Sequence, residues 1–222
     1  MPTIQEAHFW YPEDDPVHGF DHILRVYHLA ERLALAEGAD MEIVCAAALL
    51  HDANRGEPVS SEKEPSQTGG TEHWLQHQND SAELAHQVLK AEGWSEERIA
   101  AVLHCIRSHR FRNDSELPQT LEAQVLFDAD KLDAMGAVGV ARTIAYAARA
   151  GQPVYVEPSH RFQQTGFKEP GEPHSAYHEY LFKLVRLKDR LYTASARSLA
   201  EERHRWMVEF FERLTEEVEG ER

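Results

Sequence analysis

The stretch MEIVCAAALLHD, residues 41–52, decides how this chain folds. All of residues 41–50 except Glu42 are apolar, which predicts a helix that is buried all round at the centre of a core. Asp40 precedes this helix as a candidate N-cap. His51 and Asp52 close the run, and burying two strongly hydrated groups costs free energy unless something binds them. A metal ion is the expected partner, because imidazole and carboxylate are both good metal ligands.

Helical periodicity continues along most of the chain, and strand patterns are nearly absent, so we predict an all-α fold. The predicted helices cover residues 21–37, 41–52, about 80–93, a stretch that begins after Ser95, about 120–150, 176–191 and 194–219. Gly38 ends the first, and an Asp80/Glu83 capping box begins the third. A break is expected near Gly136 or Gly139. Residues 56–79 and 151–175 are rich in proline, glycine and polar residues, and we expect them to be irregular loops.

Bulk composition describes an ordinary globular protein of 222 residues, 42% hydrophobic and 27% charged. The net charge of −15 argues against a surface for DNA or RNA, but a bound cation can still attract a small anionic substrate. No apolar run approaches the roughly 20 residues that span a bilayer, and the N-terminus does not resemble a secretory signal. Cys45 and Cys105 are too few for a disulfide framework, so we expect a cytoplasmic protein with no membrane partner.

Further metal ligands are expected from two other parts of the chain. His22 shares an apolar stripe with Val26 and so projects into the core. With His51 and Asp52 it gives three ligands on two helices that should pack together. A fourth is expected from residues 126–133, where Asp128 and Asp130 both lie on apolar stripes, so that periodicity does not choose between them. Residues two apart on a helix point about 200° away from each other, so only one of the two should bind the ion.

The combination of these motifs resembles the HD-domain superfamily of metal-dependent phosphohydrolases. His22 stands in an Asp-His-x-x-Arg-Val setting, His51-Asp52 is the second element, and Ala-Asp-Lys-Leu at 129–132 is similar to the family's Ala-Asp-Arg-Leu, which assigns the last ligand to Asp130. Further likeness to a bacterial subgroup of HD hydrolases covers residues 18–22, 81–85, 106–109, 128–137, 184–188 and 200–207. The resemblance implies a helical bundle as one domain over 1–222, with its core at about 18–150 and two extra C-terminal helices at about 176–219.

Two imidazoles and two carboxylates suit one divalent ion of manganese, iron, cobalt, nickel or zinc better than magnesium. In the reaction that this implies, a metal-activated water attacks phosphorus, and Asp52 both binds the metal and accepts the water's proton. His109 is expected to line the pocket or to protonate the leaving group. A second ion held with the help of His77 and His109 is a less favoured alternative.

Other residues are expected to bind the substrate or support the ligands. Lys131 and Arg25 are candidate cations for the substrate's phosphate, and Lys131 is also a candidate catalytic residue. His18, one turn before His22, and Asp128 are expected to support the metal ligands.

The function that we expect is hydrolysis of a nucleotide or other small phosphate ester, with nucleotide pyrophosphohydrolase and phosphomonoesterase as the leading forms. A cyclic-nucleotide phosphodiesterase is also compatible with the resemblance. The main alternative is a catalytically idle, metal-stabilised sensor that binds a nucleotide, and a weaker one is a purely structural metal site. The C-terminal helices either cover the core or pair with a second copy in a homodimer.

Overall fold

The computed structural model describes residues 1–11, 19–53, 70–110 and 116–221, with only the backbone of 70–79. Every regular element in these ranges is a helix, which confirms the all-α prediction. The chain divides into two compact units, Met1–Asp130 and Lys131–Arg222, and each is described by itself. The single domain expected over 1–222 stays a prediction.

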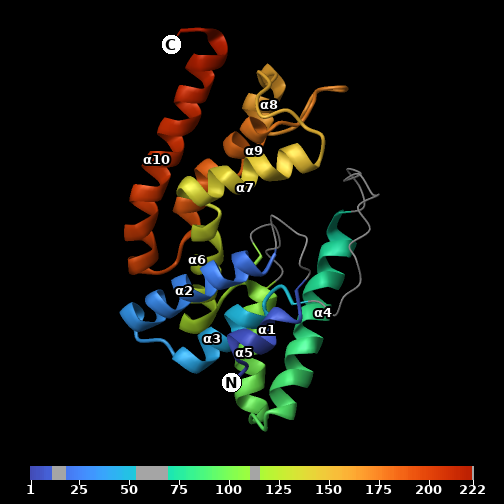
Figure 1. Cartoon of the computed structure of the whole chain (residues 1–222), viewed down its shortest axis with the longest axis vertical. Coiled ribbons are helices and arrows are strands. Elements are labelled where there is room, and N and C mark those ends of the chain that lie inside the picture. Colours follow the sequence, from blue (N-terminus) through green and yellow to red (C-terminus); the bar gives the residue numbers. More distant parts are fainter. Residues whose placement is uncertain (12–18, 54–69, 111–115, 222) are drawn as a thin grey trace. The chain divides into compact units, whose positions relative to one another are not determined.

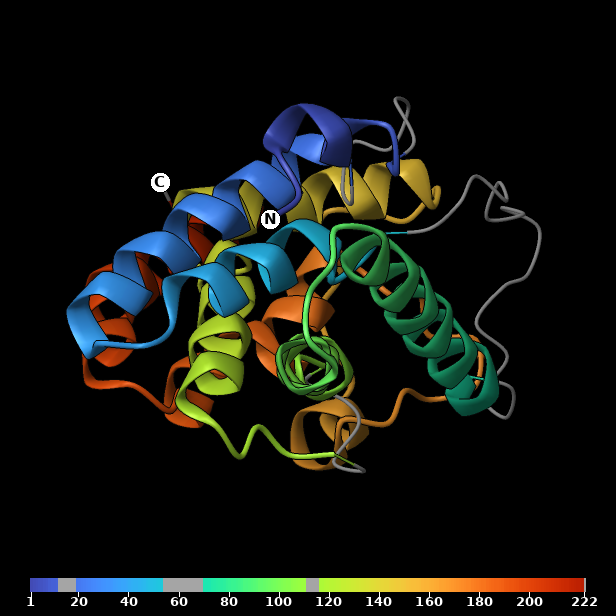
Figure 2. The same ribbon diagram turned by 90° about the horizontal axis from the view of Figure 1, so that it is seen from below.

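The first unit is built around α3 (Met41–Leu50), whose residues 43–50 are all buried. α3 packs against α1 (Ile4–His8), α2 (Phe20–Glu37), α4 (Gly70–Ala91) and α5 (Glu96–Ser108). Figure 2 shows α2 and α3 running side by side and views α5 almost end-on. Most of α6 (Leu121–Asp133) completes this unit. The apolar run at 41–50 therefore forms the predicted central helix.

Local side-chain and backbone interactions fix the ends of these helices. Asp40 caps α3, because its Oδ1 accepts hydrogen bonds from the N–H groups of Glu42 and Ile43 at 3.0 and 3.2 Å. Gly38 ends α2 with a φ of 77°, a left-handed conformation that favours glycine. At the other end of α3, the buried Tyr11 hydroxyl donates to the carbonyl of Leu49 at 2.8 Å. Such carbonyls have no partner within the helix itself, so Tyr11 satisfies one of them.

Two of the predicted helix limits in this unit are wrong. Asp80 does not begin a helix: α4 already starts at Gly70, and the exposed Asp80 lies inside it. The Asp80/Glu83 pattern is equally compatible with an exposed helix face, and residues 70–79 contain no proline to stop the helix upstream. α3 ends at Leu50, and His51 and Asp52 form a turn beyond it.

The second unit contains α7 (Gly136–Arg149), α8 (His160–Thr165), α9 (Ala176–Phe182), a 3-10 helix η1 (Leu184–Arg190) and α10 (Ala194–Glu219). α10, drawn in red in Figure 1, packs against α7 and η1, and α7 packs against α9. The predicted break falls at Gly136, where φ is 68°. The helix predicted at 176–191 is in fact α9 followed by η1, and the loop expected at 151–175 includes the short α8. No helix in the described ranges is long and apolar enough to span a membrane.

Candidate metal centre

Three side chains from different helices of the first unit converge at one place. His22 lies in the first turns of α2, His51 is the C-cap of α3, and Asp130 lies near the end of α6. One ligand atom from each lies within 4.8 Å of the others, and His22 Nε2 is 3.6 Å from Asp130 Oδ1. Both imidazoles are buried, whereas the Asp130 side chain is 18% exposed. This is a suitable arrangement for holding one cation.

A second group shares His51 with the first. One ligand atom each of His51, Asp52 and His109 lies within 4.8 Å of the others. Asp52 Oδ2 is 3.8 Å from His51 Nε2, and Asp52 Oδ1 is 3.4 Å from His109 Nε2. His109 is the C-cap of α5, so the end of a further helix reaches the same place. The two groups together contain all four of the predicted metal ligands, with His109 as a fifth candidate.

The hydrogen bonding of His51 shows that these residues fit a metal ion. His51 Nδ1 is 2.8 Å from the carbonyl oxygen of Ala48, and because a carbonyl only accepts, Nδ1 carries the hydrogen. The lone pair of a neutral imidazole is then on Nε2. This nitrogen is buried and has no hydrogen-bond partner among the described residues. An unmatched buried acceptor costs free energy, and a divalent cation held with Asp52 and Asp130 would remove that cost.

The charges of the second group suit metal binding as well. Burial acts to raise the pKa of Asp52, but Arg110 and then the neighbouring histidines outweigh it and hold this pKa well below its usual range. Burial lowers the pKa of His109 to about 4. Its Nδ1 lies 2.5 Å from the carbonyl oxygen of Ile106 and therefore carries the hydrogen of the neutral ring. At neutral pH the carboxylate is charged and the imidazole is neutral, as metal ligands must be.

The structure separates the two aspartates that periodicity could not. Asp130 belongs to the cluster with His22 and His51, whereas Asp128 is fully buried and belongs to neither group. Lys131, next to Asp130, is also buried. Arg25 forms an ion pair with Asp21 at 2.5 Å, one helical turn away on the same helix. His18 and the side chain of His77 lie outside the described residues.

Arg110 is a neighbour of the cluster that the sequence analysis missed. Its Nη2 donates to Asp52 Oδ1 at 2.8 Å. The only sequence signal was its position directly after His109, because 58 residues separate it from Asp52.

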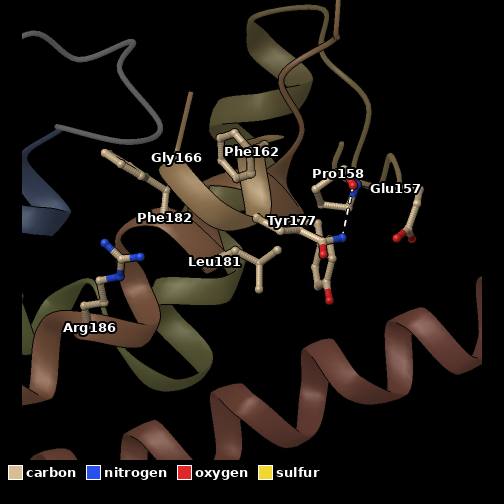
Figure 3. Close-up of a pocket in the computed structure, with 9 residues that line it drawn as sticks. Glu157, Pro158, Phe162, Gly166, Tyr177, Leu181, Phe182 and Arg186 are labelled. Atoms are coloured by element: carbon tan, nitrogen blue, oxygen red, sulfur yellow. Dashed lines mark hydrogen bonds between the residues drawn. The ribbon is translucent and has the colours of Figure 1, made fainter. Parts of the chain in front are cut away.

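The second unit contains a cavity of about 350 Å³ that involves none of these residues. In Figure 3, Phe182 and Arg186 lie on one side of it and Glu157 on the other. None of the nine lining residues is a predicted site residue, and no histidine is among them. Among the residues that the structure describes, both groups suited to a metal ion lie in the first unit.

Comparison with known proteins agrees with this picture. The chain is 33% identical to the protein YpgQ of Bacillus subtilis over 206 residues, which cover 91% of this chain and 85% of YpgQ. The crystal structure of YpgQ in complex with ADP matches with a TM-score of 0.69 at 29% identity, covering 97% of this chain and 98% of that one. An HD-superfamily hydrolase from Bacillus thuringiensis matches with a TM-score of 0.66 at 28% identity, covering 97% and 94%.

The family model of the HD domain matches residues 19–135, which contain all four predicted metal ligands. This range ends shortly after Asp130, so the match also includes the carboxylate that the structure brings to His22 and His51. By its sequence, its helical fold and its structural relatives, this chain belongs to the HD-domain superfamily.

Proposed function

We propose that this chain is a metal-dependent phosphohydrolase that acts on a nucleotide or another small phosphate ester. The observation that carries the proposal is the Nε2 of His51, which is buried, has no hydrogen-bond partner among the described residues and belongs to both groups of ligand atoms. Family membership supports hydrolase chemistry. The ADP bound by YpgQ supports a nucleotide as substrate.

In this proposal His22, His51, Asp52 and Asp130 hold one divalent ion. Two imidazoles and two carboxylates favour manganese, iron, cobalt, nickel or zinc over magnesium. A bound ion would polarise the phosphoryl group and lower the pKa of the attacking water. Asp128 and His18 are proposed to support these ligands.

The chain's own residues would then share the remaining tasks. Asp52 is proposed to accept the proton of the water, because its two oxygens face different neighbours, His51 and His109. His109 is proposed to line the site or to protonate the leaving group through Nε2, because its Nδ1 is directed at the Ile106 carbonyl. Lys131 and Arg25 are proposed to attract the substrate's phosphate, and Lys131 also to assist catalysis.

The assembly that we propose is one functional domain over 1–222, located in the cytoplasm, with the C-terminal helices available to pair in a homodimer. The acidic net charge of −15 supports a small phosphorylated substrate in place of DNA or RNA.

The experiment is a panel of nucleoside tri-, di- and monophosphates and a simple aryl phosphate, assayed with manganese and with a chelator as control. Release of pyrophosphate would identify a pyrophosphohydrolase, and release of orthophosphate from a monoester a phosphomonoesterase. Metal-dependent nucleotide binding without any product would instead support the idle sensor. Unfolding on chelation at the same metal concentration that abolishes activity would support a structural site.

A further inference from the structure

We propose that Arg110 is a substrate-binding residue of this site, which holds Asp52 in place and supplies a guanidinium group to the phosphate of the substrate. The inference rests on the proposed function, because it assumes that a phosphate binds beside the ion held by Asp52. It adds a residue that neither the family motifs nor the helical periodicity of the chain indicates.

The position of Arg110 is set by the end of α5. His109 is the C-cap of this helix and Arg110 follows it directly, so the end of the helix brings both side chains to Asp52. Arg110 Nη2 donates to Asp52 Oδ1 at 2.8 Å, and the arginine side chain is 23% exposed, against 14% for Asp52. The arginine side chain is therefore close to the buried ligands and still partly exposed, with its Nε buried.

The two oxygens of Asp52 face different neighbours. Oδ2 lies 3.8 Å from Nε2 of His51, on the side where the ligand atoms gather. In the part of the chain that the structure describes, this Nε2 has no hydrogen-bond partner. Oδ1 accepts from Arg110 and lies 3.4 Å from His109 Nε2. Arg110 thereby fixes the carboxylate in the orientation that presents Oδ2 to His51. Because the Asp52 carboxylate already has this orientation, it does not have to be ordered when the ion binds.

A guanidinium in this position suits a phosphate. It is planar, always charged and has five N–H donors, so it can bind a carboxylate and a phosphate at the same time. A chain with a net charge of −15 repels an anionic substrate unless local cations compensate. Arg110 is a cation that the structure places directly on a carboxylate of the cluster, whereas Arg25 pairs with Asp21, which is 64% exposed.

Arg107 provides a matched control. It lies in the last turn of the same helix, three residues before Arg110, and pairs with Glu116 at 3.1 Å. Neither Arg107 nor Glu116 belongs to the ligand groups. Arg107→Gln and Arg110→Gln therefore remove the same charge from the same end of α5, but only the second removes it from the cluster.

The test measures binding of adenosine 5′-(α,β-methylene)diphosphate, a non-hydrolysable analogue, to the full-length manganese-loaded protein by calorimetry. Arg110→Gln should weaken analogue binding by about tenfold to hundredfold, the size expected for a lost hydrogen bond between charged groups. Arg107→Gln should stay within about twofold of wild type. Manganese affinity, measured by titration without the analogue, should also fall in Arg110→Gln, because Asp52 loses the group that orients it, but it should fall by clearly less than analogue affinity does.

Three results would overturn the inference. The first is unchanged analogue binding in Arg110→Gln. The second is an equal loss of manganese and analogue affinity in this variant, which would mean that Arg110 acts only through Asp52. The third is that the wild type does not bind the analogue. If Arg110→Gln does not fold, Arg110→Lys takes its place, because lysine keeps the charge and loses the planar fork. It should weaken analogue binding by about tenfold, and unchanged binding would overturn the inference. A wild type that binds the analogue through Arg110 but hydrolyses nothing would refute only the proposed function.

Discussion

Both units of the chain bury a histidine beside carboxylates, but the two clusters differ in how their ring nitrogens are satisfied. In the first unit, His51 Nε2 is buried and has no hydrogen-bond partner in the described ranges. In the second unit, both ring nitrogens of His178 have partners: Ser175 Oγ lies 2.7 Å from Nδ1, and Glu172 Oε1 lies 3.1 Å from Nε2. Both histidines are fully buried, so burial alone does not distinguish them.

The second cluster contains the residue types of a serine hydrolase triad, Ser175, His178 and Glu172, but the two ring nitrogens are reversed, because Nδ1 faces the serine and Nε2 the carboxylate. Its surroundings show a structural role. Ser175 is fully buried, and its hydroxyl caps α9 by accepting the N–H of His178 at 3.2 Å. Glu172 also accepts from the N–H and the hydroxyl of Ser159, at 2.8 and 2.7 Å. These bonds tie the loop before α8 to the loop before α9.

Whether a buried histidine–carboxylate cluster binds a ligand or stabilises the fold is indicated by which of its polar atoms lack a hydrogen-bond partner. A saturated network stabilises the fold and offers a ligand nothing. A buried acceptor without a partner costs free energy, and a ligand that binds there removes this cost by supplying the partner.

The largest expected effect is on activity in the first unit. We expect His51→Ala to lower kcat/KM by about a thousandfold or more, because bound metal contributes several kcal/mol to the transition state. Manganese titration should show that high-affinity binding is lost as well. His28→Ala, an exposed histidine on α2, is the control and should behave as wild type. Full activity in His51→Ala would remove the distinction between the clusters.

The next effect is on stability in the second unit. We expect His178→Ala to lower the free energy of unfolding by about 3 kcal/mol, because it removes a fully buried side chain together with its hydrogen bonds to Ser175 and Glu172. Urea denaturation measures this loss. Manganese affinity should be unchanged, and a His178→Ala protein that loses the metal would contradict a purely structural role.

Metal addition should separate the two variants in one measurement. Manganese at about a hundred times its Kd should stabilise the folded protein by about 2.7 kcal/mol, and a chelator should reverse this. Melting temperatures should show the increment in wild type and in His178→Ala and no increment in His51→Ala. An equal increment in all three proteins would mean that manganese binds elsewhere.

A smaller effect is expected at the opposite end of α3 from His51. Asp40→Ala removes the N-cap of this helix and should cost about 1 kcal/mol of unfolding free energy in chemical denaturation. Metal affinity should stay within a few-fold of wild type, because the cap stabilises the helix without touching the ligands. A large loss of metal binding would show that the orientation of α3 depends on this cap.

The smallest effect is a pH dependence in the second cluster. Desolvation acts to raise the pKa of Glu172, but hydrogen bonds led by those from Ser159 bring it to about 2. Since an unfolded Glu titrates at about 4.3, the unfolded state binds more protons between these two pKa values, and stability is lost as the pH falls through this range. Glu172→Gln should remove up to about one proton from this dependence, measured by melting at pH 5 to 2. Identical pH profiles would contradict the assignment.

Features that depend on neighbouring residues, such as helix limits, could be predicted from the sequence. Contacts between residues far apart in the chain could not. Gly38 and Ser95 were predicted correctly as helix limits because capping depends on a few neighbouring residues. Asp80 was wrong because an acidic pair on an exposed helix face has the same spacing as a capping box. The choice of Asp130 over Asp128 needed either the family resemblance or the structure, since both lie on apolar stripes. Arg110 could not be found, because nothing local indicates a partner 58 residues away.

The hydrogen bond from Tyr11 to Leu49 has a practical consequence for making shorter versions of this protein. The family match begins at residue 19, so a fragment trimmed to those limits would lack Tyr11. Its removal would leave a carbonyl bare two residues before His51 and expose the end of the central helix to solvent. Fragments intended for crystallisation or screening should therefore keep the first eleven residues, even though the family profile does not include them.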